Sequence, residues 1–482
     1  MKTIIAEKPS VAREIARIVG ATKREEGYFE GGGYAVTWAF GHLVQLAMPD
    51  GYGVRGFVRD NLPIIPDTFT LVPRQVRTEK GYKPDSGVVS QIKVIKRLFD
   101  TSEHIIVATD AGREGELIFR YLYHYTGCTT PFVRLWISSL TDKAIREGLR
   151  KLEDGSKYDN LYLAAKARSE SDWLVGINGT QALSIAAGHG TYSVGRVQTP
   201  TLAMVCARFR ENRGFVSVPY WQLHVTLSKD GRLCRFFHKD DFREKTQADA
   251  AFSRIVPGAT GRVTKAECRR SDRQPPLLYD LTALQKYCNV HHDMTAEKTL
   301  AVAQSLYEKK LISYPRTGSR YIPHDVMRTV PELLQKVCTM PEFHTYGATF
   351  DLSVLNNHSV NDSKVTDHHA LIVTGVAPSG VSGDERAVYL MIAGRMLEAF
   401  SPPCVTETHL TEAEICGMPF RSKSTSVIIP GWRAVFDRKE DRGEDESDDN
   451  AACPAFSVGD TAPVSGHGLA QRKTMPRQLY TE

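Results

Sequence analysis

The sequence predicts a multidomain protein of mixed class, in which an α/β domain is followed by helical and β-rich domains. Three observations support this prediction. Two strand-turn-helix units near the N-terminus indicate a parallel α/β sheet. A stretch rich in alanine, leucine and charged residues at helical spacing follows, and strand-like alternation begins near residue 216. The 482 residues also exceed what one hydrophobic core supports, so three or four domains are expected.

The first domain, an α/β domain, is expected over residues 1–150. Residues 3–7 have the composition of a short buried strand, and the amphipathic helix that follows them ends at Gly20. The second unit is a strand at 104–110, followed by a turn and a helix over 113–125. The carboxyl ends of such strands meet at one edge of a parallel sheet, where ligands bind.

The rest of the chain alternates between helical and strand-like patterns. A helical domain is expected over 151–215, and another, over 275–400, is expected between two strand-rich pieces at 216–274 and 401–476 that form one β domain. The expected elements are helices at 158–187, 281–287 and 295–310, a short strand at 311–314, and strands near 221–227, 406–414 and 424–435.

Composition favours a cytoplasmic protein with a phosphate-binding face. No stretch approaches the roughly 18 apolar residues of a membrane span, and the N-terminus has no export signal. Nine scattered cysteines without a CxxC pair favour reduced thiols. The net charge of +5 is mild, but acidic residues crowd the segment 439–450, which is expected to be a solvated loop, and the remainder is more basic.

Two carboxylates are expected at the ligand-binding edge of the sheet. Glu7 and Asp110 each stand where a predicted strand gives way to a helix, and Glu114 follows one helical turn beyond Asp110. Paired carboxylates that leave room for substrate phosphates suit Mg²⁺. The alternative is that these acidic residues only favour helix N-termini through capping and the helix dipole.

A tyrosine and an arginine form a second candidate site. A free tyrosine hydroxyl is a poor nucleophile, and a nearby guanidinium favours its phenolate and binds phosphate. Tyr314 and Arg316 can supply this pair, and they project from the same side if the backbone is extended. The alternatives are that this segment is an ordinary turn, or that Tyr321 is the nucleophile.

A third candidate site has the character of a DNA-backbone contact. Glycine, arginine and glutamine precede a predicted helix at 193–202, and amides at a helix start together with arginine suit a phosphate. Arg168 lies in the helical stretch before it, and Asp172 and Trp173 beside it either face the same ligand or are packing residues. Gly-Arg turns are common, so the pattern alone is weak.

Together these motifs resemble the type IA DNA topoisomerases, with topoisomerase III of the bacterial type as the nearest form. Residues 6–10 (Ala-Glu-Lys-Pro-Ser) and 110–115 (Asp-Ala-Gly-Arg-Glu-Gly) look like the acidic motifs of the topoisomerase-primase (Toprim) fold. Residues 312–321 resemble the family's active-site tyrosine motif, and 193–202 its DNA-binding signature. Residues 366–370 (Thr-Asp-His-His-Ala) resemble a further motif whose first histidine, His368, approaches the scissile phosphate.

The resemblance implies a Toprim α/β domain whose helical and β-rich partners form a toroidal core, and an ATP-independent reaction. Tyr314 would form a 5′-phosphotyrosyl link with the cut strand. The enzyme would then pass another strand through the gap and religate the cut strand. The resemblance implies negatively supercoiled and single-stranded DNA as partners, and a helicase as a candidate protein partner. It also implies that the protein associates with the nucleoid. The implied catalytic residues are Tyr314, Arg316, Glu7, Lys8, Glu114 and His368; the metal ligands are Glu7 and Asp110; the DNA-binding residues are Arg168, Ser193, Val194, Gly195, Arg196, Val197, Gln198 and Arg316.

The sequence departs from the family pattern at two places. Gly112 replaces an aspartate of the second acidic motif, which leaves the number of metal ions open, and Gly318 replaces an aspartate of the tyrosine motif. The resemblance also implies that residues 477–482 begin a return segment that is cut short. Weak or absent relaxation with retained single-strand binding is therefore expected. The alternatives are a DNA-binding remnant without turnover and a Toprim primase or nuclease.

Overall fold

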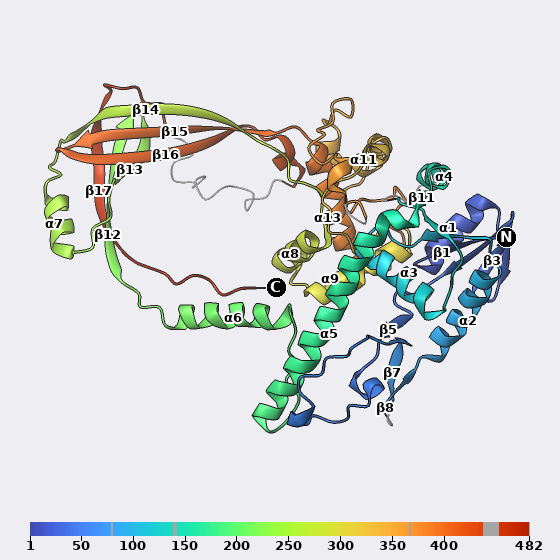
Figure 1. Ribbon diagram of the computed structural model, residues 1–482. Helices are drawn as coiled ribbons and strands as arrows, with labels where there is room; N and C mark the ends of the chain where they lie inside the picture. Colours follow the sequence, from blue (N-terminus) through green and yellow to red (C-terminus); the bar gives the residue numbers. More distant parts are fainter. Residues whose placement is uncertain (79–80, 138–141, 366–367, 437–452, 482) are drawn as a thin grey trace. The chain divides into compact units, whose positions relative to one another are not determined.

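The computed structural model describes residues 1–482 except 79–80, 138–141, 366–367, 437–452 and 482. The chain divides into two compact units, each described by itself (Figure 1). The first consists of Met1–Met204, Thr317–Ser319 and Ser363–His369, and the second of the remaining segments, Val205–Arg316, Arg320–Asp362 and Ala370–Glu482. The finer domain division expected from the sequence stays a prediction, and the acidic segment 439–450 lies outside the described residues.

The first unit is built on a seven-stranded mixed sheet in the order β11-β10-β9-β1-β4-β3-β2. The four central strands run parallel, and the flanking strands pair antiparallel. The strands are β1 Lys2–Ala6, β2 Lys23–Glu25, β3 Tyr28–Gly31, β4 Tyr34–Trp38, β9 His104–Ala108, β10 Phe132–Arg134 and β11 Glu153–Asp154. Two small two-stranded sheets accompany it: β5 Val44–Leu46 with β6 Leu71–Pro73, and β7 Gln75–Thr78 with β8 Gly81–Pro84.

Helices cover both faces of this sheet. Successive residues of a strand point to opposite faces, so Ile4 packs with α1 (Pro9–Val19) and α4 (Asp142–Arg150), whereas Ile5 packs with α2 (Ser86–Asp100) and α3 (Arg113–Tyr125). Burial on both sides explains why the central strands are almost wholly apolar. The predicted parallel α/β sheet is therefore confirmed, and so are the helices that end at Gly20 and near residue 125.

The long helix α5 (Asp159–Ala187) packs against the α/β unit through a tryptophan. Trp173 is buried; its ring lies edge-on to Tyr52 and Phe69, and its Nε1 donates to the carbonyl oxygen of Ala47 at 2.8 Å. Trp173 is thus a packing residue, one of the two alternatives left by the sequence. Helix α6 (Gln198–Arg213) follows and has no buried residue.

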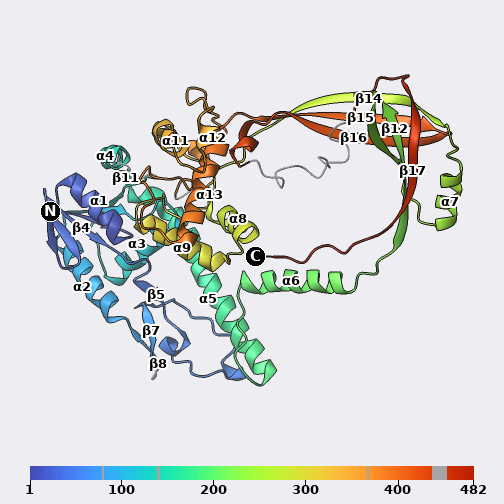
Figure 2. The ribbon, with the colours of Figure 1, turned by 180° about the vertical axis from the view of Figure 1, so that it is seen from behind.

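The second unit contains a closed barrel in the order β12-β13-β16-β15-β14-β17 (Figures 1 and 2). Strands from both strand-rich stretches of the sequence enter it, and their inward residues form one core. The second stretch was expected to continue as strand to residue 435, which is wrong: after Pro430 a 3-10 helix forms over Gly431–Val435. The strands are β12 Pro219–Lys229, β13 Arg232–His238, β14 Thr260–Arg273, β15 Cys404–Ile415, β16 Met418–Ile429 and β17 Thr461–Lys473, with helix α7 Lys245–Ser253.

The helical part of the second unit surrounds α13 (Gly383–Phe400), most of which is buried. The predicted strand at 311–314 is wrong. Only Ile312 bridges to Val373, because Pro315 has no N–H with which to extend the ladder. The other helices are α8 Leu281–His292, α9 Ala296–Glu308, α10 His324–Met327, α11 Val330–Cys338 and α12 His344–Gly347.

One disulfide corrects the expectation of reduced thiols. Cys234 on β13 and Cys453 are bonded across 219 residues of sequence. Cys453 lies between β16 and β17, and the fold brings it to β13, a pairing of which sequence spacing carries no sign. Among the described helices, none combines the length and apolar character needed to cross a lipid bilayer.

Candidate active site

The structure places Glu7 and Asp110 beside each other at the carboxyl edge of the sheet. Ala6 of β1 and Ala108 of β9 are partners in register; Glu7 follows Ala6 directly, and Asp110 stands two residues after Ala108. The Asp110 amide donates to Glu7 Oε2 at 3.3 Å, and the side chains are only 14% and 18% exposed. The parallel pairing of β1 and β9 thus brings together two carboxylates that are far apart in sequence, and both offer oxygen ligands.

The side chains of Lys8 and His368 converge on Asp110. Lys8 Nζ lies 2.8 Å from Asp110 Oδ2 and 3.8 Å from Glu7 Oε1, and His368 Nε2 lies 3.0 Å from the same Oδ2. Burial alone would raise the pKa of the Asp110 carboxyl, but the hydrogen bond from His368 and the charge of Lys8 hold that pKa well below its usual value. The pKa of Glu7 is raised, first by burial and then by the charge of Asp110. Asp110 therefore stays ionised, and the ionised form of the neighbouring Glu7 would be stabilised by a nearby cation.

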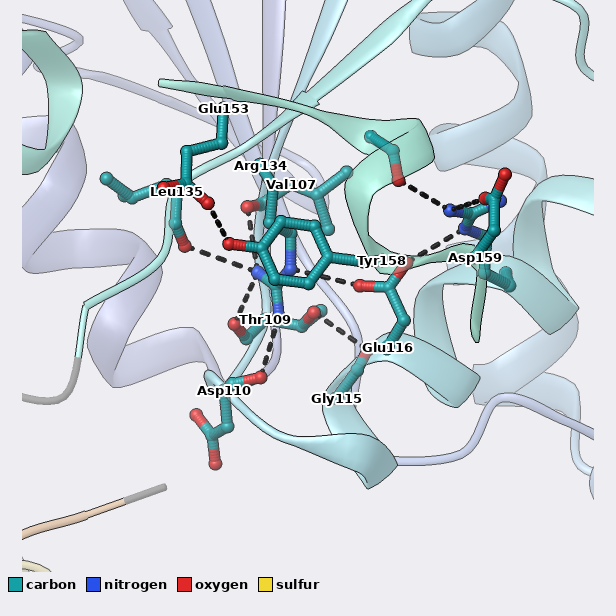
Figure 3. A network of polar contacts seen from close by, with 12 residues as sticks. Val107, Thr109, Asp110, Gly115, Glu116, Arg134, Leu135, Glu153, Tyr158 and Asp159 are labelled. Atoms are coloured by element: carbon teal, nitrogen blue, oxygen red, sulfur yellow. Dashed lines mark hydrogen bonds and ion pairs between the residues drawn. The ribbon is translucent and has the colours of Figure 1, made fainter. Parts of the chain in front are cut away.

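A buried arginine fixes the backbone that carries Asp110 (Figure 3). Arg134 on β10 is fully buried and its Nη2 donates to the carbonyl oxygen of Asp110 at 2.7 Å. Its Nε donates to Glu116 Oε2 at 3.0 Å, which pairs the buried charge with a carboxylate from α3. The remaining acceptors are the carbonyl oxygens of Val107, Thr109 and Leu135 at 2.9, 2.8 and 3.3 Å. Sequence reasoning missed this role, because the acceptors are backbone atoms.

Glycine at position 115 lets α3 approach the end of β9. A Cβ atom there would lie 2.1 Å from the carbonyl oxygen of Asp110. Thr109 Oγ1 donates to the Gly115 carbonyl at 2.8 Å across the same contact (Figure 3). The second glycine of the 110–115 motif is therefore required by packing, whereas Gly112 precedes the helix in an extended conformation.

Glu114 pairs with basic groups. Its Oε1 lies 3.2 Å from Arg168 Nη1, and its Oε2 lies 3.4 Å from His42 Nε2. The hydrogen bond with His42, followed by the charges of His42 and Arg168, lowers the pKa of the Glu114 carboxyl. A carboxyl with a lowered pKa is a weak proton donor near neutral pH. The structure gives Glu114 a place beside Arg168, a contact that the sequence did not predict.

Residues 193–198, the predicted DNA-binding segment, form a loop that hydrogen bonds and an ion pair hold beside α5. Arg196 contacts Asp172 through two nitrogens, at 2.6 and 3.3 Å, and Arg168 Nε lies 3.8 Å from the same carboxylate. Asp172 therefore orients two arginines, and its place in a DNA-binding groove stays a prediction. Further bonds hold the loop: Val194 N to Thr180 Oγ1 at 2.9 Å, Gly195 N to Thr199 Oγ1 at 3.1 Å, and Gln198 Nε2 to Ser193 Oγ at 2.7 Å. Val197 is 65% exposed.

The tyrosine motif begins in the second unit. Tyr314 is half-buried and its ring meets Tyr307 at 5.2 Å in an edge-on contact, while Arg316 is exposed. In the first unit, Thr317 Oγ1 donates to the His368 carbonyl at 2.8 Å. A Cβ atom at Gly318 would meet no described atom within 4 Å, so packing does not require glycine at this position. Thr366 and Asp367 of the histidine motif lie outside the described residues.

Comparison with known proteins identifies the class. Residues 156–482 match the family model described as DNA topoisomerase, and residues 2–140 match the Toprim domain, a domain that generally binds divalent metal. The chain belongs to the DNA topoisomerase family, in its type IA, topoisomerase III-like form.

Its relatives include DNA topoisomerase 3 of Bacillus subtilis, 39% identical over 489 residues that cover 99% of this chain and 66% of that protein. DNA topoisomerase 3 of Shouchella clausii is 40% identical over 498 residues, which cover 100% of this chain and 65% of that protein. The chain thus spans slightly less than two thirds of these curated relatives. Full-length topoisomerase I of Thermotoga maritima shares the fold, with a TM-score of 0.66, 20% identity, and coverage of 99% of this chain and 73% of that one.

The paired carboxylates fit a divalent ion. A hard cation takes oxygen donors, and Glu7 and Asp110 offer them from two rigid strand ends. The pKa of Glu7 is raised by burial and then by the charge of Asp110, and a cation held by the two groups would offset both effects. The identity of the ion and the roles of the individual site residues stay predictions.

Proposed function

We propose that this chain is an ATP-independent DNA strand-passage enzyme in which Tyr314 cleaves one strand and later religates it. The observation that carries the proposal is the Glu7–Asp110 pair with Lys8 and His368 around Asp110, in a chain of the topoisomerase family. The bond chemistry needs no nucleotide. The Tyr314 hydroxyl oxygen attacks phosphorus and gives up its proton to water, a phosphotyrosyl bond replaces the phosphodiester bond, and the 3′-oxygen leaves and takes up a proton; reversal restores the strand.

In this proposal the first unit handles charge and protons. Mg²⁺, held by Glu7 and Asp110 when bound, supplies neutralisation of phosphate charge. Lys8 and His368 both contact the Asp110 carboxylate, and these contacts keep it ionised during the reaction. The 3′-oxygen must gain a proton as it leaves. Because the pKa of Glu114 is lowered, we assign delivery of that proton to water, with Glu114 as the group that orients it.

Single-stranded DNA is the proposed ligand of the segment 193–198 and of Arg168. Arginine and the amides at the start of a helix contact phosphate without reading base sequence. Asp172 holds Arg196 and Arg168 in fixed positions, which lowers the entropy lost when a strand binds. Arg316, exposed beside Tyr314, is proposed to bind the phosphate under attack. Negatively supercoiled DNA, which exposes single strands, is the proposed substrate, and a helicase is the proposed partner.

The proposal is tested with negatively supercoiled plasmid, Mg²⁺ and no ATP. We expect topoisomers that differ by single steps of linking number, at least as a weak activity, and none from Tyr314→Phe. Tyr321→Phe is the matched control, because Tyr321 lies in the same loop. Relaxation by Tyr314→Phe at the wild-type rate contradicts the proposal. Retained single-strand binding without relaxation favours a binding remnant, and accumulating nicks favour a nuclease.

A further inference from the structure

Three side chains with different ligand atoms meet on strands β14 and β15 of the second unit. Cys268 of β14 and His409 of β15 are direct partners in the antiparallel register. Glu407 stands two residues before His409, so its side chain lies on the same face of the sheet. The two strands lie side by side along their length in Figure 1. Backbone pairing therefore sets the spacing of all three side chains.

The ligand atoms are close enough to share one metal ion. The thiol sulfur, a carboxylate oxygen and an imidazole nitrogen all lie within 4.8 Å of one another. His409 Nε2 is 2.8 Å from Glu407 Oε1. Ligand atoms on a tetrahedral zinc ion are about 3.3–3.8 Å apart, which follows from the metal–ligand bond lengths. Small rotations of the three side chains reach that spacing without moving the strands.

The pairing of the histidine favours a metal site over a cysteine nucleophile. A nucleophilic cysteine is activated by a histidine that acts as its base. Here His409 Nε2 pairs with Glu407 instead, at 2.8 Å. A bound metal ion would take the ligand atoms of all three side chains in place of such contacts.

The charged and polar neighbours of Cys268, Glu407 and His409 are compatible with metal binding by these three side chains. Glu267 lies on the opposite face of β14, where Lys265 and Arg269 pair with it at 2.7 Å each. Arg270 is the register partner of Glu407, and the positive charge it brings offsets part of the negative charge that two anionic ligands create. Ser424 of β16 is the register partner of His409, so a hydroxyl rather than a competing charge stands on the third strand.

We propose that Cys268, Glu407 and His409 bind one divalent transition-metal ion of the zinc class. A sulfur, nitrogen and oxygen donor set is the one zinc accepts, and three protein ligands leave a fourth position for water. The ion ties β14 to β15 and stabilises this part of the second unit. The set differs from Glu7 and Asp110, which offer oxygen alone. The proposal is independent of strand cleavage.

Cobalt(II) is the probe that tests this site, because only a thiolate ligand gives a sulfur-to-cobalt charge-transfer band. The full chain is freed of metal with a chelator and titrated with Co²⁺. We expect the band to saturate at one ion per chain and to disappear when Zn²⁺ is added. The oxygen-only pair of the first unit cannot produce this band, so the two sites are distinguished.

Variants assign the ligands. Cys268→Ser abolishes the band, whereas Cys206→Ser, which removes an exposed cysteine of α6, leaves it unchanged. Glu407→Gln and His409→Gln each weaken Co²⁺ binding by at least about 10-fold, the lower end of the loss seen for mere outer-shell partners. Circular dichroism checks that each variant is folded. No band in the folded wild type, or a band that survives Cys268→Ser, overturns the proposal.

Discussion

At the scale of single residues, Asp110 is held from two directions. Lys8 and His368 contact its carboxylate, and the buried Arg134 donates a hydrogen bond to its backbone carbonyl oxygen. The position of Asp110 beside Glu7 follows from strand order, and the sequence predicts it. The role of Arg134 was not predictable, because an arginine inside a strand shows only after folding that its acceptors are carbonyl oxygens.

Arg134→Lys tests this internal support. A lysine keeps the charge but cannot reach Glu116 and several carbonyls at once, so buried acceptors lose their donor. We expect the free energy of unfolding to fall by about 2–4 kcal/mol, and Mg²⁺ affinity to fall with it. Urea unfolding and Mg²⁺ titration measure the two effects. Arg17→Lys, at an exposed position, is the control, and equal stability of both variants would show that the buried contacts contribute little.

Gly115→Ala tests the close approach of α3 to Asp110. The added Cβ would lie 2.1 Å from the Asp110 carbonyl oxygen, so the helix or the end of β9 must move. We expect a loss of about 1–3 kcal/mol in stability, the usual cost of overpacking, together with weaker Mg²⁺ binding. Gly383→Ala is the matched control, because a Cβ there meets no described atom within 4 Å. Unchanged Mg²⁺ affinity in Gly115→Ala would argue against strict positioning of Asp110.

At the scale of elements, regular structure followed the sequence patterns wherever one face or both faces of an element are buried. The strands that carry Glu7 and Asp110 and the helices after them were predicted on that basis. The strand expected at 311–314 failed because pairing depends on a distant partner, and Pro315 ends it. The expectation of reduced thiols failed for Cys234 and Cys453 for a similar reason, since only the fold brings these two distant residues together.

Helix α13 is secured at its start by a charged capping box. Ser382 and Glu385 cap each other, and Lys309 Nζ lies 2.6 and 2.8 Å from the Glu385 oxygens. Hydrogen bonds from Lys309 and then Ser305 lower the pKa of Glu385 to about 2, from an ordinary value of 4.5. Because the folded pKa is the lower one, the stabilisation is complete above about pH 4.5 and is lost as pH falls toward about 2.

Glu385→Gln keeps the cap but removes this charge. We expect it to lower the unfolding free energy at pH 7 by about 1–2 kcal/mol, since Lys309 is partly exposed and its charge is screened. The difference from wild type should shrink steadily below pH 4.5. Urea unfolding at several pH values measures it. Glu332→Gln on the exposed face of α11 is the control; a difference that does not change with pH would contradict the charge assignment.

The loop that follows α5 gives an element-scale prediction for DNA. If Arg196 contacts a phosphate, Arg196→Ala weakens binding of every single-stranded sequence alike. The slope of log affinity against log salt should then fall by about 0.7, the change for one phosphate contact on a single strand. Fluorescence anisotropy at several salt concentrations measures both. Arg17→Ala, on α1, is the control, and a sequence-dependent loss would indicate base contact instead.

At the scale of the whole molecule, the residues proposed for the reaction are divided between two compact units. The carboxylates, Lys8 and His368 belong to the first unit, while Tyr314 and Arg316 belong to the second. Family membership rests on matches along nearly the whole chain, although the chain spans only 65–66% of its curated relatives. The sequence predicted this family from short motifs that lie in both units.

The most direct test of the central claim is to trap the covalent intermediate. Labelled single-stranded DNA is incubated with the protein, with and without Mg²⁺, and the mixture is denatured before electrophoresis. We predict a protein-DNA adduct that is absent from Tyr314→Phe and present in Tyr321→Phe. An adduct that persists in Tyr314→Phe would contradict the account, and so would the absence of any adduct from folded wild-type protein that still binds the DNA.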